Sequence, residues 1–227
     1  MLELDHVVYF SKQSPQENVQ KHKGTAIGGR HKSWGTVNAL TYTQNSYIEY
    51  LSVENNEIAK QSNHPLITLL LNDLEDGEGW GTICMRVNQI EVLNERLCNQ
   101  GLSTSGVINA ERETISGFVR KWKMLFINQN ISDELPYPFF IEWEEPFEER
   151  MQSLREDGSI QAYNEQLQIS ECVIAVNDPT SQVMEWANIL EVNHENHTIV
   201  LPNTTIVFQH NVEGKNRLKM VKLVQDN

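Results

Sequence analysis

Basic residues are scarce in this sequence. The 227-residue chain has 18 lysines and arginines against 31 aspartates and glutamates, which gives a formal net charge of −13. Nucleic-acid binding requires concentrated positive charge that neutralises phosphate groups, so DNA and RNA are not expected partners. The same negative charge disfavours attachment to an anionic membrane surface.

Long hydrophobic runs are also missing. The longest, near Leu66–Leu71, is far shorter than the roughly 20 apolar residues that a membrane-spanning helix requires. The first residues include acidic side chains and do not show the basic and then apolar order of a secretory signal. We therefore expect a cytoplasmic protein that does not cross a membrane.

Cysteines and familiar motifs are few as well. The three cysteines are widely spaced and form no Cys-x-x-Cys pair, which predicts reduced thiols. The sequence contains no Gly-x-Ser-x-Gly motif, no P-loop and no Rossmann fingerprint. None of the hydrolase or nucleotide-binding classes that these motifs mark is therefore indicated.

A repeated order of elements is the main structural signal. The chain is 39% hydrophobic, enough for a core, and its length fits one large domain or two. Near the start, Ser14, Pro15 and Glu17 supply an N-cap, a proline at the first helical position and a capping box. In order, the first unit has a strand at Leu4–Phe10, a helix from Ser14 to Lys23, and strands at Thr25–Gly28, Thr36–Tyr42 and Tyr47–Val53.

The same order of elements returns twice. The second unit has a strand at Trp80–Val87, a helix from an Asn88–Glu91 capping box to Gly101, and strands at Thr104–Ala110, Gly117–Ile127 and Phe139–Trp143. The third, looser unit has a strand at Cys172–Val176, a helix from Asp178 to Leu190, and strands at Thr198–Leu201, Thr204–His210 and Arg217–Val224.

These repeats predict the fold class. Three strands follow each helix with only short turns between them, which favours a mixed, largely antiparallel sheet over a doubly wound parallel one. We predict an α+β fold with tandem βαβββ modules at residues 1–60 and 80–146, joined by a linker helix at 61–79. Residues 147–227 add a third, partial module of βαββ type, which either helps to close the cleft or forms the contact of a homodimer.

Several motifs add a family resemblance to this topology. They are Leu4-Asp-His6, Gly29-Arg30-His31 followed by Gly35-Thr36-x-Asn38, Tyr47-Ile-Glu49-Tyr50, Arg120-x-Trp122 and Pro138–Trp143. With the two βαβββ units, they make residues 1–146 resemble the vicinal oxygen chelate superfamily, and within it the glyoxalase-like domain group. The resemblance implies that the two units curl into an open, incomplete barrel with a cleft for a small molecule.

The resemblance also implies a metal site. In the metal-binding members, each unit offers one ligand from its first strand and one from its last. By position, the first unit supplies His6 and Glu49, and the second supplies Glu142. The fourth position falls on Thr82, a poor replacement for histidine or a carboxylate. Such a set suits a divalent ion (Mn, Fe, Zn or Mg) with open positions. Glu142, if it is not a ligand, is the candidate catalytic base.

Other residues are candidates for substrate binding. Arg30 and His31 lie in a glycine-rich stretch where they could capture a carboxylate or another oxyanion. Arg120 and Trp122 share one face of a predicted strand. The full set of substrate-binding candidates is Arg30, His31, Trp34, Asn38, Arg120, Trp122 and Trp143.

Each of these candidates has a simpler interpretation. His6 could be a strand histidine that bonds a neighbouring side chain, and Glu49 could pair with Arg30 or Arg120 without a metal. Glu142 lies in an acidic run and could be one of several solvated carboxylates. Trp34 could merely order a surface loop.

Two functions from different classes follow. One is a metal-assisted lyase, isomerase or dioxygenase that acts on a small oxygenated molecule. The other is a metal-free protein that binds or sequesters a small molecule in the same cleft. His6, Glu49 and Glu142 favour the enzyme, which we take as the working prediction, whereas Thr82 favours the binding protein.

Overall fold

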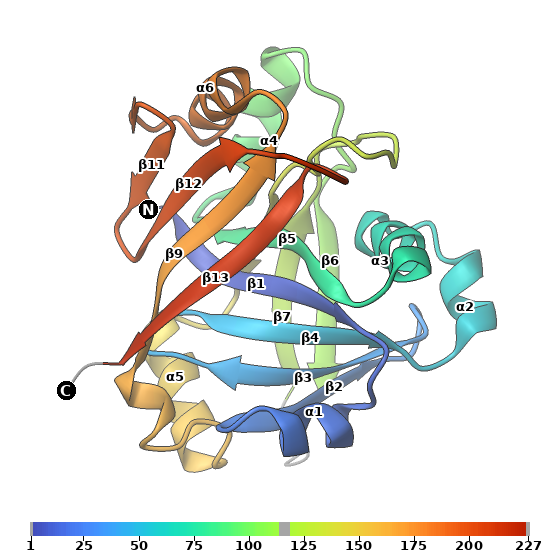
Figure 1. The fold of residues 1–227 in the computed structure, drawn as a ribbon. Helices are drawn as coiled ribbons and strands as arrows, with labels where there is room; N and C mark the ends of the chain where they lie inside the picture. The colour runs from blue at the N-terminus through green and yellow to red at the C-terminus, as the bar shows by residue number, and fades with distance from the viewer. Residues whose placement is uncertain (1, 114–118, 226–227) are drawn as a thin grey trace.

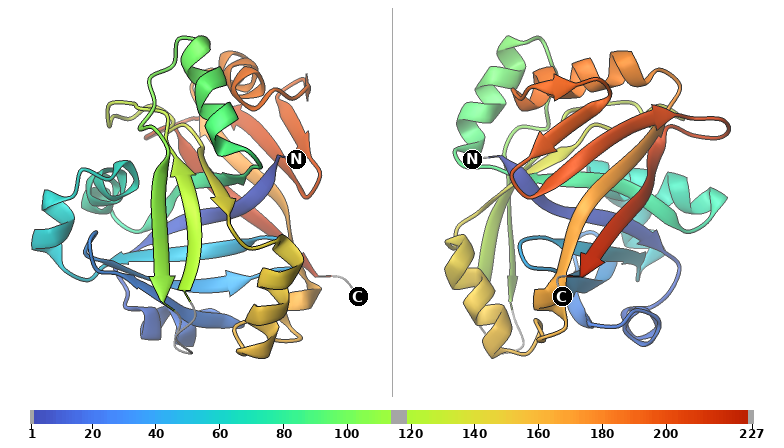
Figure 2. Two further views of the ribbon diagram at one scale, coloured as in Figure 1. Left: turned by 180° about the vertical axis from the view of Figure 1, so that it is seen from behind. Right: turned by 60° about the vertical axis from the view of Figure 1, so that its left-hand side comes forward.

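The computed structural model describes residues 2–113 and 119–225 of the chain. Its strands form two sheets, one of eight strands and one of five (Figure 1). The eight-stranded sheet curls strongly, so that strands β6 and β7 cross over strands β3 and β4 when the molecule is seen from behind (Figure 2). The concave face of this sheet encloses the candidate site.

The first half of the large sheet follows the predicted order. Its elements are β1 (Glu3–Ser11), α1 (Pro15–Lys21), β2 (Thr25–His31), β3 (Thr36–Tyr42) and β4 (Tyr47–Val53). Ser14 accepts a hydrogen bond from the backbone of Glu17, whose side chain returns to the backbone of Ser14, so the predicted capping box is present. We call β1 to β4 the first module.

The second half repeats this order. Its elements are β5 (Gly79–Arg86), α4 (Ile90–Asn99), β6 (Ile108–Glu113), β7 (Val119–Leu125) and β8 (Phe139–Trp143), and we call them the second module. Strand β6 begins later than predicted, because Thr104 forms only an isolated bridge to Ile127. Residues 117 and 118 of the predicted seventh strand lie outside the described residues.

The order of strands across the sheet is β2-β3-β4-β1-β5-β8-β7-β6. Within each module the first and last strands are parallel neighbours, β1 with β4 and β5 with β8. Antiparallel pairing of β1 with β5 joins the modules, and His6 lies directly opposite Cys84. The predicted α+β fold, with tandem modules and a mixed sheet, is therefore confirmed.

Two helices connect the modules. Helix α2 (Asn56–Gln61) was not predicted, whereas α3 (Pro65–Asp76) corresponds to the expected linker helix. Leu66, Ile67 and Leu70 of α3 are buried against the concave side of the sheet. None of the helices in the described part of the chain is long and apolar enough to span a membrane.

The rest of the chain forms α5, a short 3-10 turn and the five-stranded sheet. The elements are α5 (Phe147–Glu156), the turn at Asn164–Gln166, β9 (Leu167–Val176), α6 (Pro179–Leu190), β10 (His194–Glu195), β11 (Thr198–Leu201), β12 (Thr204–His210) and β13 (Arg217–Gln225). The sheet order is β10-β11-β12-β9-β13, with β9 parallel to β12. With β9, α6, β10, β11 and β12, the third unit repeats the topology of the two modules. The short strand β10 was not predicted, and β13 is an additional strand on the other side of β9.

The third unit lies behind the candidate site. Its buried residues join one core cluster with Leu4, Val7, Ile83 and Met85, which belong to the central strands of the large sheet. Val8, Phe10, Cys84 and several cavity-lining side chains belong to a separate cluster on the concave side. The central strands β1 and β5 are therefore covered on both faces, and the concave face keeps its cavity.

Candidate functional site

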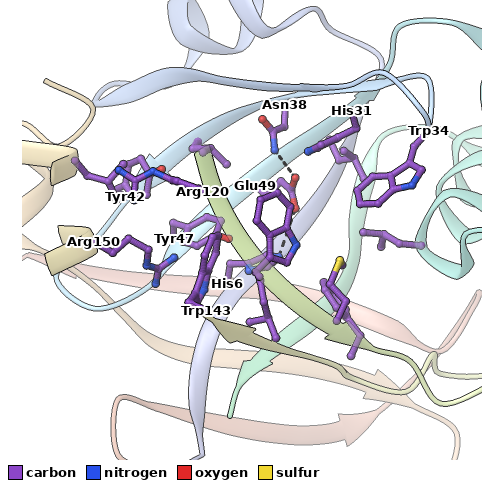
Figure 3. Close-up of a pocket in the computed structure, with 18 of the residues that line it drawn as sticks. His6, His31, Trp34, Asn38, Tyr42, Tyr47, Glu49, Arg120, Trp143 and Arg150 are labelled. Carbon is purple, nitrogen blue, oxygen red and sulfur yellow. Dashed lines mark hydrogen bonds and ion pairs between the residues drawn. The ribbon is translucent and has the colours of Figure 1, made fainter. Parts of the chain in front are cut away.

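A cavity of about 70 Å³ lies inside the concave face of the large sheet (Figure 3). Strands β1, β3, β4, β7 and β8 contribute to its wall, together with α3 and α5. His6 and Glu49 lie at its centre, and both side chains are buried. The cavity thus gathers residues that are far apart in the sequence.

A bulge in β1 brings two neighbouring side chains together. Leu4 pairs with Met85 and His6 pairs with Cys84, so Asp5 is an extra residue in this strand. In a regular strand, Asp5 and His6 would point to opposite faces. Here Asp5 Oδ1 lies 2.8 Å from His6 Nδ1, and the two side chains form a buried ion pair.

Asp5 is completely buried and has several cationic or donor neighbours. Trp143 Nε1 donates a hydrogen bond to Asp5 Oδ2 at 3.0 Å, and Arg150 Nη2 lies 3.4 Å from the same oxygen. Burial alone would raise the pKa of Asp5, but the charge of Arg150 and the bond with His6 lower it well below its ordinary value. Asp5 is therefore a carboxylate that orients the ring of His6.

The other nitrogen of His6 faces a second carboxylate. Nε2 lies 3.4 Å from Glu49 Oε2, and Asn38 Nδ2 donates to Glu49 Oε1 at 2.5 Å. Burial raises the pKa of Glu49, but the hydrogen bond and the charge of His6 lower it. Burial lowers the pKa of His6, while Cys84, Asp5 and Glu49 together raise it well above 6.5. These shifts favour an imidazolium between two carboxylates.

Aromatic rings fix the position of the imidazole. The ring of Tyr47 stacks on His6 with centroids 4.5 Å apart, and Phe139 meets it edge-on at 5.5 Å. Trp122 and Trp143 lie 5.3 Å apart at the cavity wall. These flat surfaces suit a planar ligand.

Two buried guanidinium groups line another part of the cavity. Arg120 Nη1 lies 2.8 Å from Glu145, and its Nη2 donates to Ser153 Oγ at 2.8 Å. Arg150 stacks over Trp143 at 4.0 Å, and its Nε is buried without a hydrogen-bond partner. Arg150 was not predicted as a site residue. The sequence feature that could have indicated it is the position of Arg150 beside Met151 and Leu154, on the buried face of a charged helix.

Most of the predicted site residues do surround this cavity. The candidates that line it are His6, His31, Trp34, Asn38, Glu49, Arg120, Trp122 and Trp143. Their roles in catalysis and binding stay predictions.

Glu142 does not belong to this group. Phe139, Ile141 and Trp143 line the cavity, so strand alternation places Glu142 on the opposite face of β8. There its carboxylate accepts hydrogen bonds from the backbone N–H groups of Gln89 and Ile90, at 2.8 and 3.1 Å. Glu142 thus caps α4 in place of the predicted Asn88–Glu91 capping box. The prediction of Glu142 as metal ligand and catalytic base is corrected.

Arg30 lies outside the cavity, and its role in substrate binding stays a prediction. Its side chain is 65% exposed and pairs with Glu54 at 2.6 Å, outside the cavity. It borders an open depression of about 1300 Å³, which shares His31, Trp34, Asn38 and Trp122 with the cavity. Glu49 bonds His6 and Asn38, so the alternative pairing of Glu49 with Arg30 or Arg120 is not observed.

The second module faces His6 and Glu49 with mainly apolar side chains. Cys84 lies directly opposite His6 on β5, and Phe139 and Ile141 of β8 line the cavity. The assignment of Thr82 to the fourth ligand position stays a prediction. Burial raises the pKa of the Cys84 thiol to about 12.

The resemblance implies a divalent metal, so the donors at this site must match the ligands that such an ion needs. Asp5, His6 and Cys84 bring three ligand atoms within 4.8 Å of one another, the one such group among the described residues. However, Asp5 already faces Arg150 and Arg86, and a further dication beside them would be repelled. His6 and Glu49 alone fall short of the three protein ligands usual in catalytic zinc sites. The residues do not fit a bound divalent metal.

Comparison with known proteins places this chain in a family. A model described as a glyoxalase-like domain matches residues 4–190. None of the curated proteins matches the sequence closely enough to indicate a relationship. A hypothetical protein from Staphylococcus aureus is similar in structure, with 26% identity, 95% of this chain and 89% of that chain covered, and a TM-score of 0.80.

Two other solved structures match part of the chain at lower similarity. Methylmalonyl-CoA epimerase from Mycobacterium tuberculosis is 15% identical, with 65% of this chain and 91% of that chain covered and a TM-score of 0.39. A hypothetical protein from Bacillus halodurans C-125 is 16% identical, with 64% and 95% covered and a TM-score of 0.39. With the family match and the curled mixed sheet, the conclusion is that this chain belongs to the glyoxalase-like domain family and has the vicinal oxygen chelate fold.

Proposed function

We propose that the chain is a metal-independent enzyme of the isomerase or lyase class, which moves a proton on a small molecule. The observation that carries this proposal is the position of His6, with one ring nitrogen on Asp5 and the other facing Glu49 inside a buried cavity. His6 is the general acid, Asp5 is the residue that orients it, and the carboxylate of Glu49 is the base that receives the C–H proton. This proposal replaces the metal-assisted chemistry of our working prediction.

The two nitrogens of His6 have different tasks in this proposal. The short bond to Asp5 holds the proton on Nδ1, so Nε2 is the atom that exchanges a proton. The separation of 3.4 Å between Nε2 and Glu49 is longer than a normal hydrogen bond. A substrate atom can therefore take the place of Glu49 as the partner of Nε2, as happens when catalytic contacts tighten on binding.

The guanidinium groups indicate the chemical class of the substrate. Arg150 lines the same cavity as His6, and its Nε, buried without a hydrogen-bond partner, suits a carboxylate or an enolate oxygen, while Arg120 adds positive charge to the cavity wall. When Glu49 accepts the proton of a C–H bond next to a carbonyl group, negative charge develops on such an oxygen, and the Nε2–H group of His6 supplies the proton that returns to the substrate. The substrate we propose is a small carbonyl or carboxylate compound with an acidic C–H bond.

The cavity limits how much of the substrate it can enclose. Its volume of about 70 Å³ is roughly half that of a cavity of ~150 Å³ that holds benzene. The reacting end of the substrate therefore has only a few non-hydrogen atoms. Any larger part extends past Trp34 and Trp122 into the open depression.

Hydrogen–deuterium exchange tests the proposed proton transfer. Small enolisable carboxylates, including pyruvate, phenylpyruvate and levulinate, are first ranked by the thermal stabilisation that they give. Binders are then incubated with the protein in D₂O, and ¹H NMR follows the loss of the acidic C–H signal. We expect exchange catalysed by the wild type and a loss of about 10²–10⁴-fold in His6→Gln.

The control variant for this assay is Glu142→Gln, because Glu142 lies on the far face of β8. It should exchange at the wild-type rate. Equal exchange in the wild type and in His6→Gln would contradict the proposal. Binding that saturates without any exchange would favour the alternative function, a metal-free protein that binds or sequesters a small molecule.

A further inference from the structure

A bulge of two glycines in β2 lies next to the site. Ile27 pairs with Ala39 and Arg30 pairs with Val37, so Gly28 and Gly29 together stand opposite the single residue Asn38. The side chain of Asn38 is buried and lies between this bulge and Glu49. The bulge therefore connects the backbone of β2 to the acid–base group.

The bulge determines which way the amide of Asn38 faces. The backbone N–H of Gly29 donates to Asn38 Oδ1 at 2.6 Å, and only the oxygen of an amide can accept that bond. A Cβ atom at Gly28 would lie 2.0 Å from the same oxygen, so a side chain at this position would displace the amide. With the oxygen held here, the Nδ2 group points at Glu49.

The orientation of the amide has a consequence for Glu49. Asn38 Nδ2 can only donate, and it donates to Glu49 Oε1 at 2.5 Å. A donor of this kind stabilises the ionised form of a carboxyl group. In a buried pair of a carboxyl and an imidazole, whatever stabilises the carboxylate also keeps the proton on the imidazole.

We infer that Gly28, Gly29 and Asn38 are positioning residues that hold the carboxylate of Glu49 in place beside His6. This inference rests on the proposed function, because it explains what fixes one partner of the acid–base pair before substrate arrives. It assigns Asn38 a role different from the predicted substrate contact, since both polar atoms of its amide are engaged within the protein.

Other charged and titratable groups near His6 and Glu49 also influence the pKa values of these two residues. Asp5 and Cys84 act on His6, and His31 acts on Glu49. The charges of His31 and Glu49 also act on the pKa of His64, which precedes α3. Arg150 of α5 contacts Asp5 and so acts on His6 indirectly. None of these groups changes in the variants proposed below.

The experiment is a pH titration of the His6 ring nitrogens by ¹⁵N NMR, without substrate, in the wild type, Asn38→Ala and Gly28→Ala. Asn38→Ala removes the donor, and Gly28→Ala displaces the amide but keeps it. A hydrogen bond to a charged group is worth enough that the pKa of His6 should fall by about one unit in Asn38→Ala. Gly28→Ala should lower it in the same direction.

The matched control is Asn216→Ala, which removes a buried asparagine amide in the third unit, far from the site. It should leave the titration of His6 unchanged, although it too removes buried hydrogen bonds. An unchanged pKa of His6 in both Asn38→Ala and Gly28→Ala would overturn the positioning role. The deuterium exchange assay would still judge the role of His6, so the two failures are distinguishable.

Discussion

The two modules of the large sheet share one topology but contribute differently to the cavity. The first module places His6, His31, Asn38 and Glu49 on the concave face. In the second module, Cys84 lies opposite His6 and Ile141 faces the cavity, with Arg120 as the charged residue of its wall. The duplicated frame is therefore preserved, while the histidines and the carboxylate that line the cavity lie in the first module.

This difference explains why the site differs from the metal site that the resemblance implies. A ligand set drawn from both modules needs polar donors at all four equivalent positions. Here Trp122, Met124, Phe139, Ile141 and Trp143 make the second module a mainly apolar wall. In its place, the first module surrounds its own histidine with two carboxylates, and α5 adds Arg150.

Removing the charge of Asp5 should have the largest effect on this arrangement. Asp5→Asn leaves Arg150 and His6 without their buried counter-charge, and losing one partner of a buried ion pair costs about 3 kcal/mol or more. We expect the free energy of unfolding in urea to fall by that amount. Glu165→Gln, which breaks an exposed pair with Arg155, should change it by no more than about 1 kcal/mol. Equal losses in the two variants would contradict the account.

A smaller effect is expected on the pH dependence of the free energy of unfolding, to which His6 of the first module contributes. Because the pKa of His6 is raised in the folded protein, the stability it supplies is complete below 6.5 and is lost as pH rises through the folded pKa. In that window the wild type should lose up to about 1.4 kcal/mol per pH unit relative to His6→Gln. Urea unfolding at a series of pH values measures this difference.

The second module provides the comparison for that experiment. Ile141→Val, on the cavity face of β8, should keep the pH dependence of the wild type, whereas Glu49→Gln should reduce it. The same slope in the wild type and His6→Gln would show that His6 holds no additional proton in the folded state. That result would remove the basis for an imidazolium between two carboxylates.

The sequence predicts the frame of this molecule well because its signals are local. Strands β3 and β4 have the predicted bounds, and the Ser14 capping box is present as expected. His6 and Glu49 were placed by resemblance within the first module, and the structure brings them together. Side-chain alternation and capping residues act over a few positions, so they can be recognised without the tertiary fold.

Features that depend on exact register were predicted less well. An error of one residue in β8 assigns Glu142 to the cavity in place of Ile141, because neighbouring strand residues face opposite sides. The bulge that turns Asp5 toward His6 interrupts the alternation and has no clear sequence signature. Arg150 reaches the site from a helix beyond the second module, so only the tertiary fold shows its contact with Asp5.

The measurement that tests the central claim most directly is the ¹⁵N NMR spectrum of the His6 ring in the wild type at pH 7, before and after equimolar Zn²⁺ is added. The account predicts that both ring nitrogens are protonated and that their signals do not move with zinc. An unprotonated Nε2, or a shift of the His6 signals on addition of zinc, would contradict it and return the site to metal-assisted chemistry.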